Sequence, residues 1–393
     1  MSLPHYITDA RNLEALCRRL RESPRFALDT EFVGEQSFVP RLELIQVATG
    51  DLCAAIDYPA IGSLEGFAEL LSDPGIEKVL HAGRQDLELF HGLTGRMPVS
   101  IFDTQVAAAM VGYGTQVAYA QLVQRIVEVK LDKSHTLSNW SQRPLTDEQI
   151  AYALEDVRYL LPVYDHLQRR LQTLGRLDWV REEFARLESK VSERHQDARF
   201  RYQRIRGWDT LKPRSASVLR ELAAWRDEEA QRRNVPRGRV IRDEVLLELA
   251  RRTPAALAAL RATRGLHQSE AERNGNALLA LIKKGLAVPQ SEWPEVPKVS
   301  RPDRDAAGLV DLLQAVVKTR ALEEEIAPSL LASAADLQAL VDAKPQERET
   351  LDLPLLSGWR RKLAGEAVLQ VLDGQAVVSV EPRSGKVRLS PSS

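Results

Sequence analysis

The feature that most limits the possible folds is an alternation of strand-like and helix-like segments over the first 110 residues. Apolar runs with the length and breaks typical of strands occur at 26–33, 43–48, 52–57 and 78–83. Helical spacing of apolar residues lies between them, at 63–72 and 84–93. This mixed order predicts an α/β layered domain.

The segment 146–171 is predicted to form one long helix. Thr146 and Gln149 have the spacing of a capping box at its start, and apolar residues recur at steps of four and three. From about residue 210 strand patterns nearly vanish, and a proline-rich segment at 288–304 separates two helical blocks. We therefore expect an α/β domain followed by two small all-α modules. The expected boundaries are 1–206 for the α/β domain, 207–290 and 305–380 for the modules, 291–304 for the linker between them and 381–393 for a frayed tail.

Composition indicates an ordinary folded chain. Of the 393 residues 44% are hydrophobic and 28% are charged, and no stretch approaches the ~18 consecutive apolar residues of a membrane span. Cys17 and Cys53 are far from any metal-ligand spacing, so a reducing cytoplasm fits best. We expect no membrane contact and no organic cofactor.

The net charge of −1 hides a basic block. Residues 169–252 hold 22 Lys and Arg against 14 Asp and Glu, and the stretch RFRYQRIRGW at 199–208 alternates arginines with aromatic residues. Such interleaving suits a nucleic-acid backbone and its bases. A solvated, arginine-rich surface is the alternative interpretation.

Two acidic residues interrupt the first long strand, RFALDTEFVG at 25–34. Asp29 and Glu31 lie two apart and so share one face of the strand. Burying a bare carboxylate costs several kcal/mol unless something compensates the charge. These two residues therefore predict a cation beside the strand.

Further acidic residues lie on predicted helices. Asp86 is near the start of a helix, and Tyr152 and Asp156 lie four apart on one helix face. Taken singly, Asp86 is also explained by the helix dipole, which favours an acidic residue near a helix N-terminus. Tyr152 and Asp156 are also explained as residues of a half-exposed helix face. If the four acids converge, they need divalent metal; carboxylate oxygens favour Mg²⁺ or Mn²⁺ over zinc, and two such ions suit phosphodiester cleavage.

These residues resemble the three motifs of the DEDD exonucleases: DTE at 29–31, H-A-x-x-x-D at 81–86 and Y-x-x-x-D at 152–156. The tyrosine is typical of the DEDDy branch. The longer motifs PRLELIQVAT, KVLHAGRQDLELF, IFDTQVAAAMVGYG and NWSQRPLTDEQIAYALEDVRYL are similar to the ribonuclease D family, and two later helical segments are similar to HRDC modules. The resemblance implies a ribonuclease H-like nuclease domain, with a mixed sheet and flanking helices, followed by two HRDC modules.

The resemblance also implies roles for residues. Asp29, Glu31 and Asp156 would bind one metal, Asp29 and Asp86 a second, and Tyr152 would orient the attacking water. His81 and Lys133 match positions near the substrate, although His81 also fits a structural histidine and Lys133 a solvated loop residue.

The activity that follows is a metal-dependent 3′→5′ exoribonuclease. It would release 5′-mononucleotides, use two Mg²⁺ or Mn²⁺ ions, and trim the free 3′ ends of structured RNAs such as tRNA precursors; we expect a monomer. The alternatives are a DNA exonuclease of the Werner type and a non-catalytic RNA-binding adaptor. Metal coordination does not distinguish ribose from deoxyribose, so the acidic residues alone do not exclude a DNA exonuclease.

Overall fold

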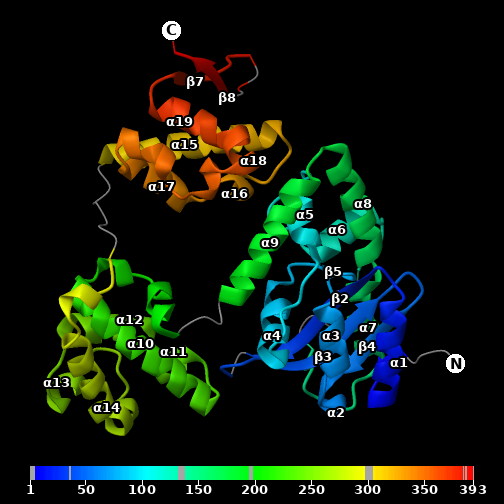
Figure 1. Cartoon of the computed structure of the whole chain (residues 1–393), viewed down its shortest axis with the longest axis horizontal. Coiled ribbons are helices and arrows are strands. Elements are labelled where there is room, and N and C mark those ends of the chain that lie inside the picture. The colour runs from blue at the N-terminus through cyan, green and yellow to red at the C-terminus, as the bar shows by residue number, and fades with distance from the viewer. Residues whose placement is uncertain are drawn as a thin grey trace. The chain divides into compact units, whose positions relative to one another are not determined.

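The computed structural model describes residues 5–34, 37–131, 138–193, 198–296, 304–383, 385 and 387–392. The chain forms two compact units (Figure 1). The first contains Met1–Glu31, Leu44–Ser192 and Ser300–Ser393, and the second contains Phe32–Glu43 and Glu193–Val299. Within the described ranges, no helix is long and apolar enough to cross a membrane.

A six-stranded mixed sheet has the strand order β1-β4-β3-β2-β5-β6. β1 runs parallel to β4, β3 antiparallel to β4, and β5 parallel to both β2 and β6. The strands are β1 (Tyr6–Ile7), β2 (Arg25–Val33), β3 (Arg41–Ala48), β4 (Cys53–Asp57), β5 (Glu77–Leu80) and β6 (Ile101–Asp103). The α/β domain predicted from the alternating pattern is confirmed, and so is the mixed sheet that the resemblance implies.

Helices cover both faces of this sheet. On one face, Phe67 of α3 packs between Phe26 of β2 and Phe90 of α4. On the other, Phe102 of β6 contacts Tyr164 of α8 and Phe184 of α9. The helices of this domain are α1 (Ala10–Arg21), α2 (Tyr58–Ile61), α3 (Glu65–Leu71), α4 (Arg84–Thr94), α5 (Thr104–Ala109), α6 (Tyr119–Ile126), α7 (Asp147–Arg158), α8 (Leu160–Thr173) and α9 (Leu177–Glu193).

The prediction of one long helix over 146–171 is wrong, because the helix breaks at Tyr159 into α7 and α8. The capping box at the start of α7 is confirmed, with both bonds between Thr146 and Gln149 present. Pro162 has no N–H to donate to the carbonyl of Arg158, which weakens the helix at this point. The hydroxyl of Tyr119 also enters the break, hydrogen-bonding to both sides of it.

The second unit is helical. Its longest helix, α10, packs against α14 and α12 around a core that includes Leu219, Leu222 and Leu278. Gly285 permits the close approach of α14 to α10, because a Cβ there would lie 2.5 Å from the Cα of Val218. The helical elements are η1 (Ala198–Arg204), η2 (Trp208–Thr210), α10 (Pro213–Arg233), α11 (Arg237–Val240), α12 (Asp243–Arg252), α13 (Leu257–Arg261), α14 (Gln268–Leu286) and η3 (Gln290–Glu292).

The C-terminal block lies in the same compact unit as the sheet domain. Trp359 stacks on Trp179 of α9, with ring centroids 5.0 Å apart, and the buried Arg360 pairs with Glu183. The helical elements of the block are α15 (Arg304–Glu323), α16 (Pro328–Leu331), α17 (Ala334–Asp342), η4 (Pro345–Thr350), η5 (Pro354–Leu356), α18 (Gly358–Arg360), η6 (Arg361–Gly365) and α19 (Glu366–Leu372).

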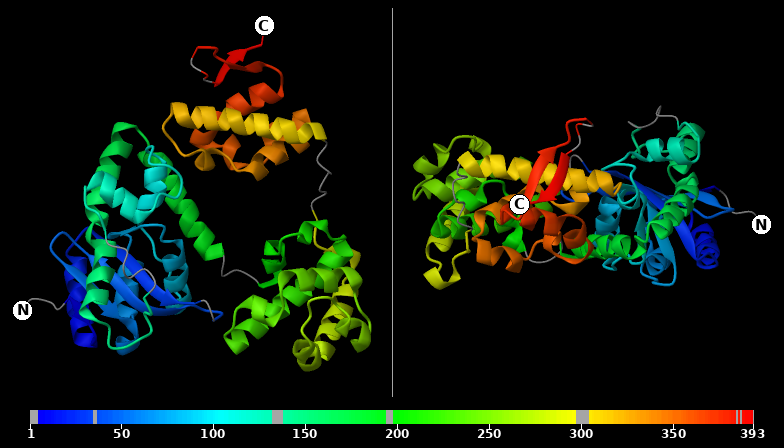
Figure 2. Two further views of the ribbon diagram at one scale, coloured as in Figure 1. Left: turned by 180° about the vertical axis from the view of Figure 1, so that it is seen from behind. Right: turned by 90° about the horizontal axis from the view of Figure 1, so that it is seen from above.

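The expectation of a frayed tail after residue 380 is wrong. β7 (Ala376–Val380) and β8 (Val387–Pro391) form an antiparallel hairpin, drawn in red in Figure 2. The alternation in AVVSV and VRLSP supports two strands, and the hairpin packs on the first and last helices of the block, α15 and α19. The C-terminal block is therefore helical with a two-stranded sheet rather than all-α.

Candidate functional site

Strand β2 carries the two acids that predicted a cation. Asp29 and Glu31 lie on one face of the strand, and the side chain of Thr30 between them is buried. The hydroxyl of Thr30 donates a hydrogen bond to Oδ1 of Asp86, which lies in the first turn of α4. Thr30 thus ties the third acid to the strand that carries the first two.

The four acids Asp29, Glu31, Asp86 and Asp156 lie close enough to interact electrostatically. Burial raises the pKa of Asp29 well above its usual range, and the charges of Asp86, Asp156 and Glu31 raise it further. Burial, with Asp156 and Asp86, raises the pKa of Glu31 to about 8. Burial likewise raises the pKa of Asp156 to about 7 and that of Asp86 to about 6.

No lysine or arginine among the described residues forms an ion pair with any of these four carboxyls. In the same part of the chain, no three acidic, histidine or cysteine side chains are already arranged to hold a metal ion. Four mutually repelling carboxyls without a cation have the chemistry of a hard divalent-metal site, and the side chains would draw together around the ions. The donor set therefore fits Mg²⁺ or Mn²⁺.

Tyr152 and Asp156 lie one turn apart on α7, as predicted. The ring of Tyr152 stacks on Trp140, with centroids 6.4 Å apart and an angle of 26° between the planes. Trp140 belongs to the loop that precedes α7 and is itself buried. The phenol is therefore held from the side by a neighbouring aromatic ring.

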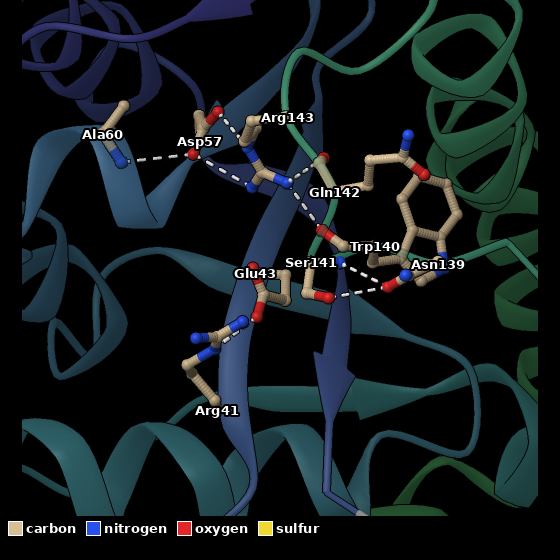
Figure 3. Close-up of polar contacts among 9 residues, drawn as sticks. All are labelled: Arg41, Glu43, Asp57, Ala60, Asn139, Trp140, Ser141, Gln142 and Arg143. Carbon is tan, nitrogen blue, oxygen red and sulfur yellow. Dashed lines mark hydrogen bonds and ion pairs between the residues drawn. The ribbon is translucent and has the colours of Figure 1, made fainter.

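Arg143 holds this loop in place (Figure 3). Its Nε and Nη2 donate to the two carboxylate oxygens of Asp57, at 2.7 and 3.0 Å, and its Nη1 donates to the carbonyl of Trp140 at 2.6 Å. Burial raises the pKa of Asp57, but hydrogen bonds from Arg143 and Tyr6 outweigh it and hold that pKa below its usual range. The pair joins the end of β4 to the loop that carries Trp140.

Two further residues, His81 and Lys133, were predicted to lie near the substrate. His81 has its Nε2 donating to the carbonyl of Val117 at 3.0 Å, its Nδ1 3.0 Å from the hydroxyl of Thr104, and its ring against Tyr119. Burial lowers the pKa of His81, so a neutral ring is favoured. Lys133 lies outside the described residues.

Sequence reasoning did not single out Thr30, Trp140, Arg143 or Tyr119. Thr30 lies inside the DTE motif and Trp140 inside NWSQRPLTDEQ, so position within a motif was a usable signal for both. For Tyr119 the signal was absent, because its partners Glu155 and Tyr159 are 36 and 40 residues away in the chain.

An arginine-lined cavity of about 420 Å³ lies in the second unit. Arg226 at its wall is buried and bonds to Asp243 and to the carbonyl of Ile241, while its Nε has no hydrogen-bond partner in the part of the chain that the structure describes. Arg204 and Arg242 also line it and are exposed, and neither has an ion-pair partner among the described residues. Five arginines face three acidic residues in this cavity, which suits an anion.

Two family models match the chain. Residues 4–172 match a 3′-5′ exonuclease model, and residues 215–282 match the HRDC domain. A ribonuclease D of Gluconacetobacter diazotrophicus is 40% identical over 385 residues, which are 96% of this chain and 95% of the relative. A ribonuclease D of Pseudomonas paraeruginosa is 39% identical over 94% of this chain and 97% of the relative.

A solved structure has the same fold as this chain over nearly the whole length of both proteins. The crystal structure of Escherichia coli RNase D, described as an exoribonuclease involved in structured RNA processing, matches with a TM-score of 0.83 and 31% identity. The match covers 95% of this chain and 99% of that one. The chain belongs to the ribonuclease D family of 3′→5′ exoribonucleases.

Proposed function

We propose that this exoribonuclease is metal-dependent, releases 5′-mononucleotides and trims the 3′ ends of structured RNAs such as tRNA precursors. The observation that carries the proposal is the group of four carboxyls around β2. Burial, and then the charges of other acids in the group, raise the pKa of Asp29 and Glu31, and no lysine or arginine among the described residues forms an ion pair with any of the four. Neutralising that repulsion is what divalent ions would do.

The proposed ligands divide between two ions. Asp29, Glu31 and Asp156 would hold one, and Asp29 with Asp86 would hold the other. When bound, two divalent ions supply activation of water and stabilisation of the leaving oxygen in phosphodiester cleavage. The hydrogen bond from Thr30 to Asp86 supports a shared site, because it orients Asp86 from the strand that carries Asp29 and Glu31.

Tyr152 is proposed to orient the attacking water with its hydroxyl. A phenol one helical turn from a metal-binding aspartate is well placed to direct a lone pair at the scissile phosphate. The stacked Trp140 and the pair of Arg143 with Asp57 support this role, because they restrict where the phenol can lie.

The RNA partner is proposed to contact the arginine-lined cavity of the second unit. Phosphate contacts of this kind position RNA without reading its sequence. We further propose that residues 305–380 are a second HRDC-like module, that the chain acts as a monomer, and that it works in the cytoplasm. The free thiols of Cys17 and Cys53 support a reducing compartment.

The test is a degradation time course with 5′-labelled RNA and DNA of matched sequence. Each is used with a free and a blocked 3′ end, and with Mg²⁺, Mn²⁺ or EDTA. Stepwise shortening of RNA alone, dependent on metal and on a free 3′-OH, supports the proposal. Equal digestion of DNA would favour the Werner-type alternative, and unchanged activity in EDTA would exclude the metal mechanism.

A further inference from the structure

We propose that Tyr119 is a positioning residue for the metal site: its hydroxyl, inserted into the break between α7 and α8, holds the helical turn that carries Asp156. The inference rests on the proposed role of Asp156 as a metal ligand. Tyr119 is the first residue of α6 and lies outside the three motifs that carry the four acids.

Two hydrogen bonds carry the argument. The hydroxyl of Tyr119 donates to the carbonyl of Glu155 at 3.1 Å and accepts from the amide N–H of Tyr159 at 3.2 Å. In an uninterrupted α-helix, the N–H of residue 159 would donate to the carbonyl of residue 155 directly. The phenol therefore bridges the two backbone groups that would bond to each other directly in a regular helix, while the Tyr159 N–H also donates to the carbonyl of Val157.

Asp156 is the residue immediately after the first of these two contacts. The inserted hydroxyl fixes the carbonyl of Glu155 on one side of Asp156 and the amide of Tyr159 on the other. Because both anchors lie within three residues of Asp156, the direction of its carboxylate depends on the geometry of this turn.

Tyr119 is itself held in place. Its ring packs against His81, with centroids 5.7 Å apart, and both nitrogens of His81 are engaged, with Thr104 and with the carbonyl of Val117. His81 thus supports the tyrosine that supports α7. A phenol keeps its proton at neutral pH, so the bond donated to Glu155 persists under working conditions.

The substitution Tyr119→Phe removes the hydroxyl and keeps the ring. Calorimetric titration of the metal-free full-length protein with Mn²⁺ alone is expected to show about 10-fold weaker binding, the usual size of an effect on a residue that orients a ligand. The Mn²⁺ concentration for half-maximal RNA hydrolysis should rise by the same factor. At saturating Mn²⁺, the kcat and the KM for RNA should return close to those of the unmodified protein.

Tyr113→Phe is the matched control, because its hydroxyl bonds to His166 instead. It should leave Mn²⁺ affinity unchanged. Hydrogen exchange gives an independent readout: peptides covering 155–163 should exchange faster in Tyr119→Phe and not in Tyr113→Phe, and melting curves would show whether either variant remains folded.

Combination with Asp156→Asn separates the inference from the proposed function. If the inference holds, Tyr119→Phe causes no further loss of Mn²⁺ affinity once Asp156 is replaced. Unmodified Mn²⁺ affinity in a folded Tyr119→Phe protein overturns the inference alone. If Asp156→Asn binds Mn²⁺ as the unmodified protein does, the proposed metal role of Asp156 fails, and the inference fails with it.

Discussion

The ring of Tyr152 lies against that of Trp140, at 6.4 Å between centroids and 26° between planes, and Trp140 is held by Arg143 through its carbonyl. Arg143 is in turn bound by both oxygens of Asp57. Asp57 at the end of β4 is therefore connected to the ring of Tyr152 through one ion pair, one hydrogen bond and one ring contact. This relay explains how a residue on a half-exposed helix face is kept in a single orientation.

The relay predicts that Trp140→Leu lowers kcat by about 10- to 100-fold, since small misplacements of a catalytic group are costly. Trp140→Phe should retain more activity, because it preserves an aromatic surface for Tyr152. Mn²⁺ affinity should stay unchanged in both. In a Tyr152→Phe background, Trp140→Leu should cause no further loss of kcat; an additional large loss would place Trp140 in a different role.

Tyr152→Phe removes only the hydroxyl proposed to orient water. We expect kcat to fall by about 100-fold or more, in the range observed when a positioned proton-handling group is lost. Mn²⁺ binding measured by calorimetry should match that of the unmodified protein. Turnover at the unmodified rate would remove Tyr152 from the mechanism.

Asp29→Asn and Asp156→Asn should each lower hydrolysis by at least about a thousand-fold, because the metal ions contribute several kcal/mol of transition-state stabilisation. Circular dichroism and melting should show a retained fold. Asp165→Asn is the control: it removes an exposed carboxylate that pairs with Arg25 on the surface, and it should leave the rate unchanged. Substantial activity of either site variant with Mg²⁺ contradicts the ligand assignment.

The raised pKa values predict a pH dependence of the metal-free protein. Burial raises the pKa of Glu31 from 4.5 to about 8, so the folded state binds this proton more tightly than the unfolded state. The contribution of this proton to the free energy of unfolding is complete below the unfolded-state pKa of 4.5. It is lost as the pH rises through the folded-state pKa of about 8. Mn²⁺ should therefore raise the Tm more at about pH 8 than at about pH 6, because metal binds the deprotonated carboxylates. An equal Mn²⁺ effect at both pH values would contradict this electrostatic description.

The arginine-lined cavity predicts a salt-dependent RNA contact. Arg204→Ala and Arg242→Ala should each weaken the binding of structured RNA by a similar factor for all sequences. Each should also reduce the slope of log binding constant against log salt concentration by about one unit. Arg252→Ala serves as the control, because Arg252 already pairs with Glu248 on the exposed side of α12. Unchanged RNA affinity and unchanged salt dependence in both cavity variants would show that RNA does not contact this cavity.

Local pattern was sufficient to predict an α/β domain and to single out the two acids of β2. Asp29 and Glu31 stand out because charged residues are costly in a strand whose other members, such as Phe26 and Leu28, are fully buried. The capping box at Thr146 is likewise a signal contained within four residues. Such features depend on neighbours in sequence, so they are visible without a structure.

Features that depend on distant partners were not predictable. Pro162 is a local signal for the break at Tyr159, but the hydroxyl that enters the break comes from 40 residues away, and Arg360 of the C-terminal block pairs with Glu183, 177 residues earlier. The hairpin of β7 and β8 is a different case. Its alternating pattern was present in the sequence, but its short strands gain stability by packing on α15 and α19, which pattern alone does not reveal.

The most direct test of the account is the stoichiometry of Mn²⁺ binding to the metal-free protein, measured by calorimetry for the unmodified chain and for Asp29→Asn. We predict two ions per unmodified chain, and loss of binding at both sites in Asp29→Asn, because this carboxylate is proposed to contact both ions. Two ions bound with equal affinity by Asp29→Asn, or no Mn²⁺ bound by the unmodified chain, would contradict the central claim that these carboxylates form a two-metal site.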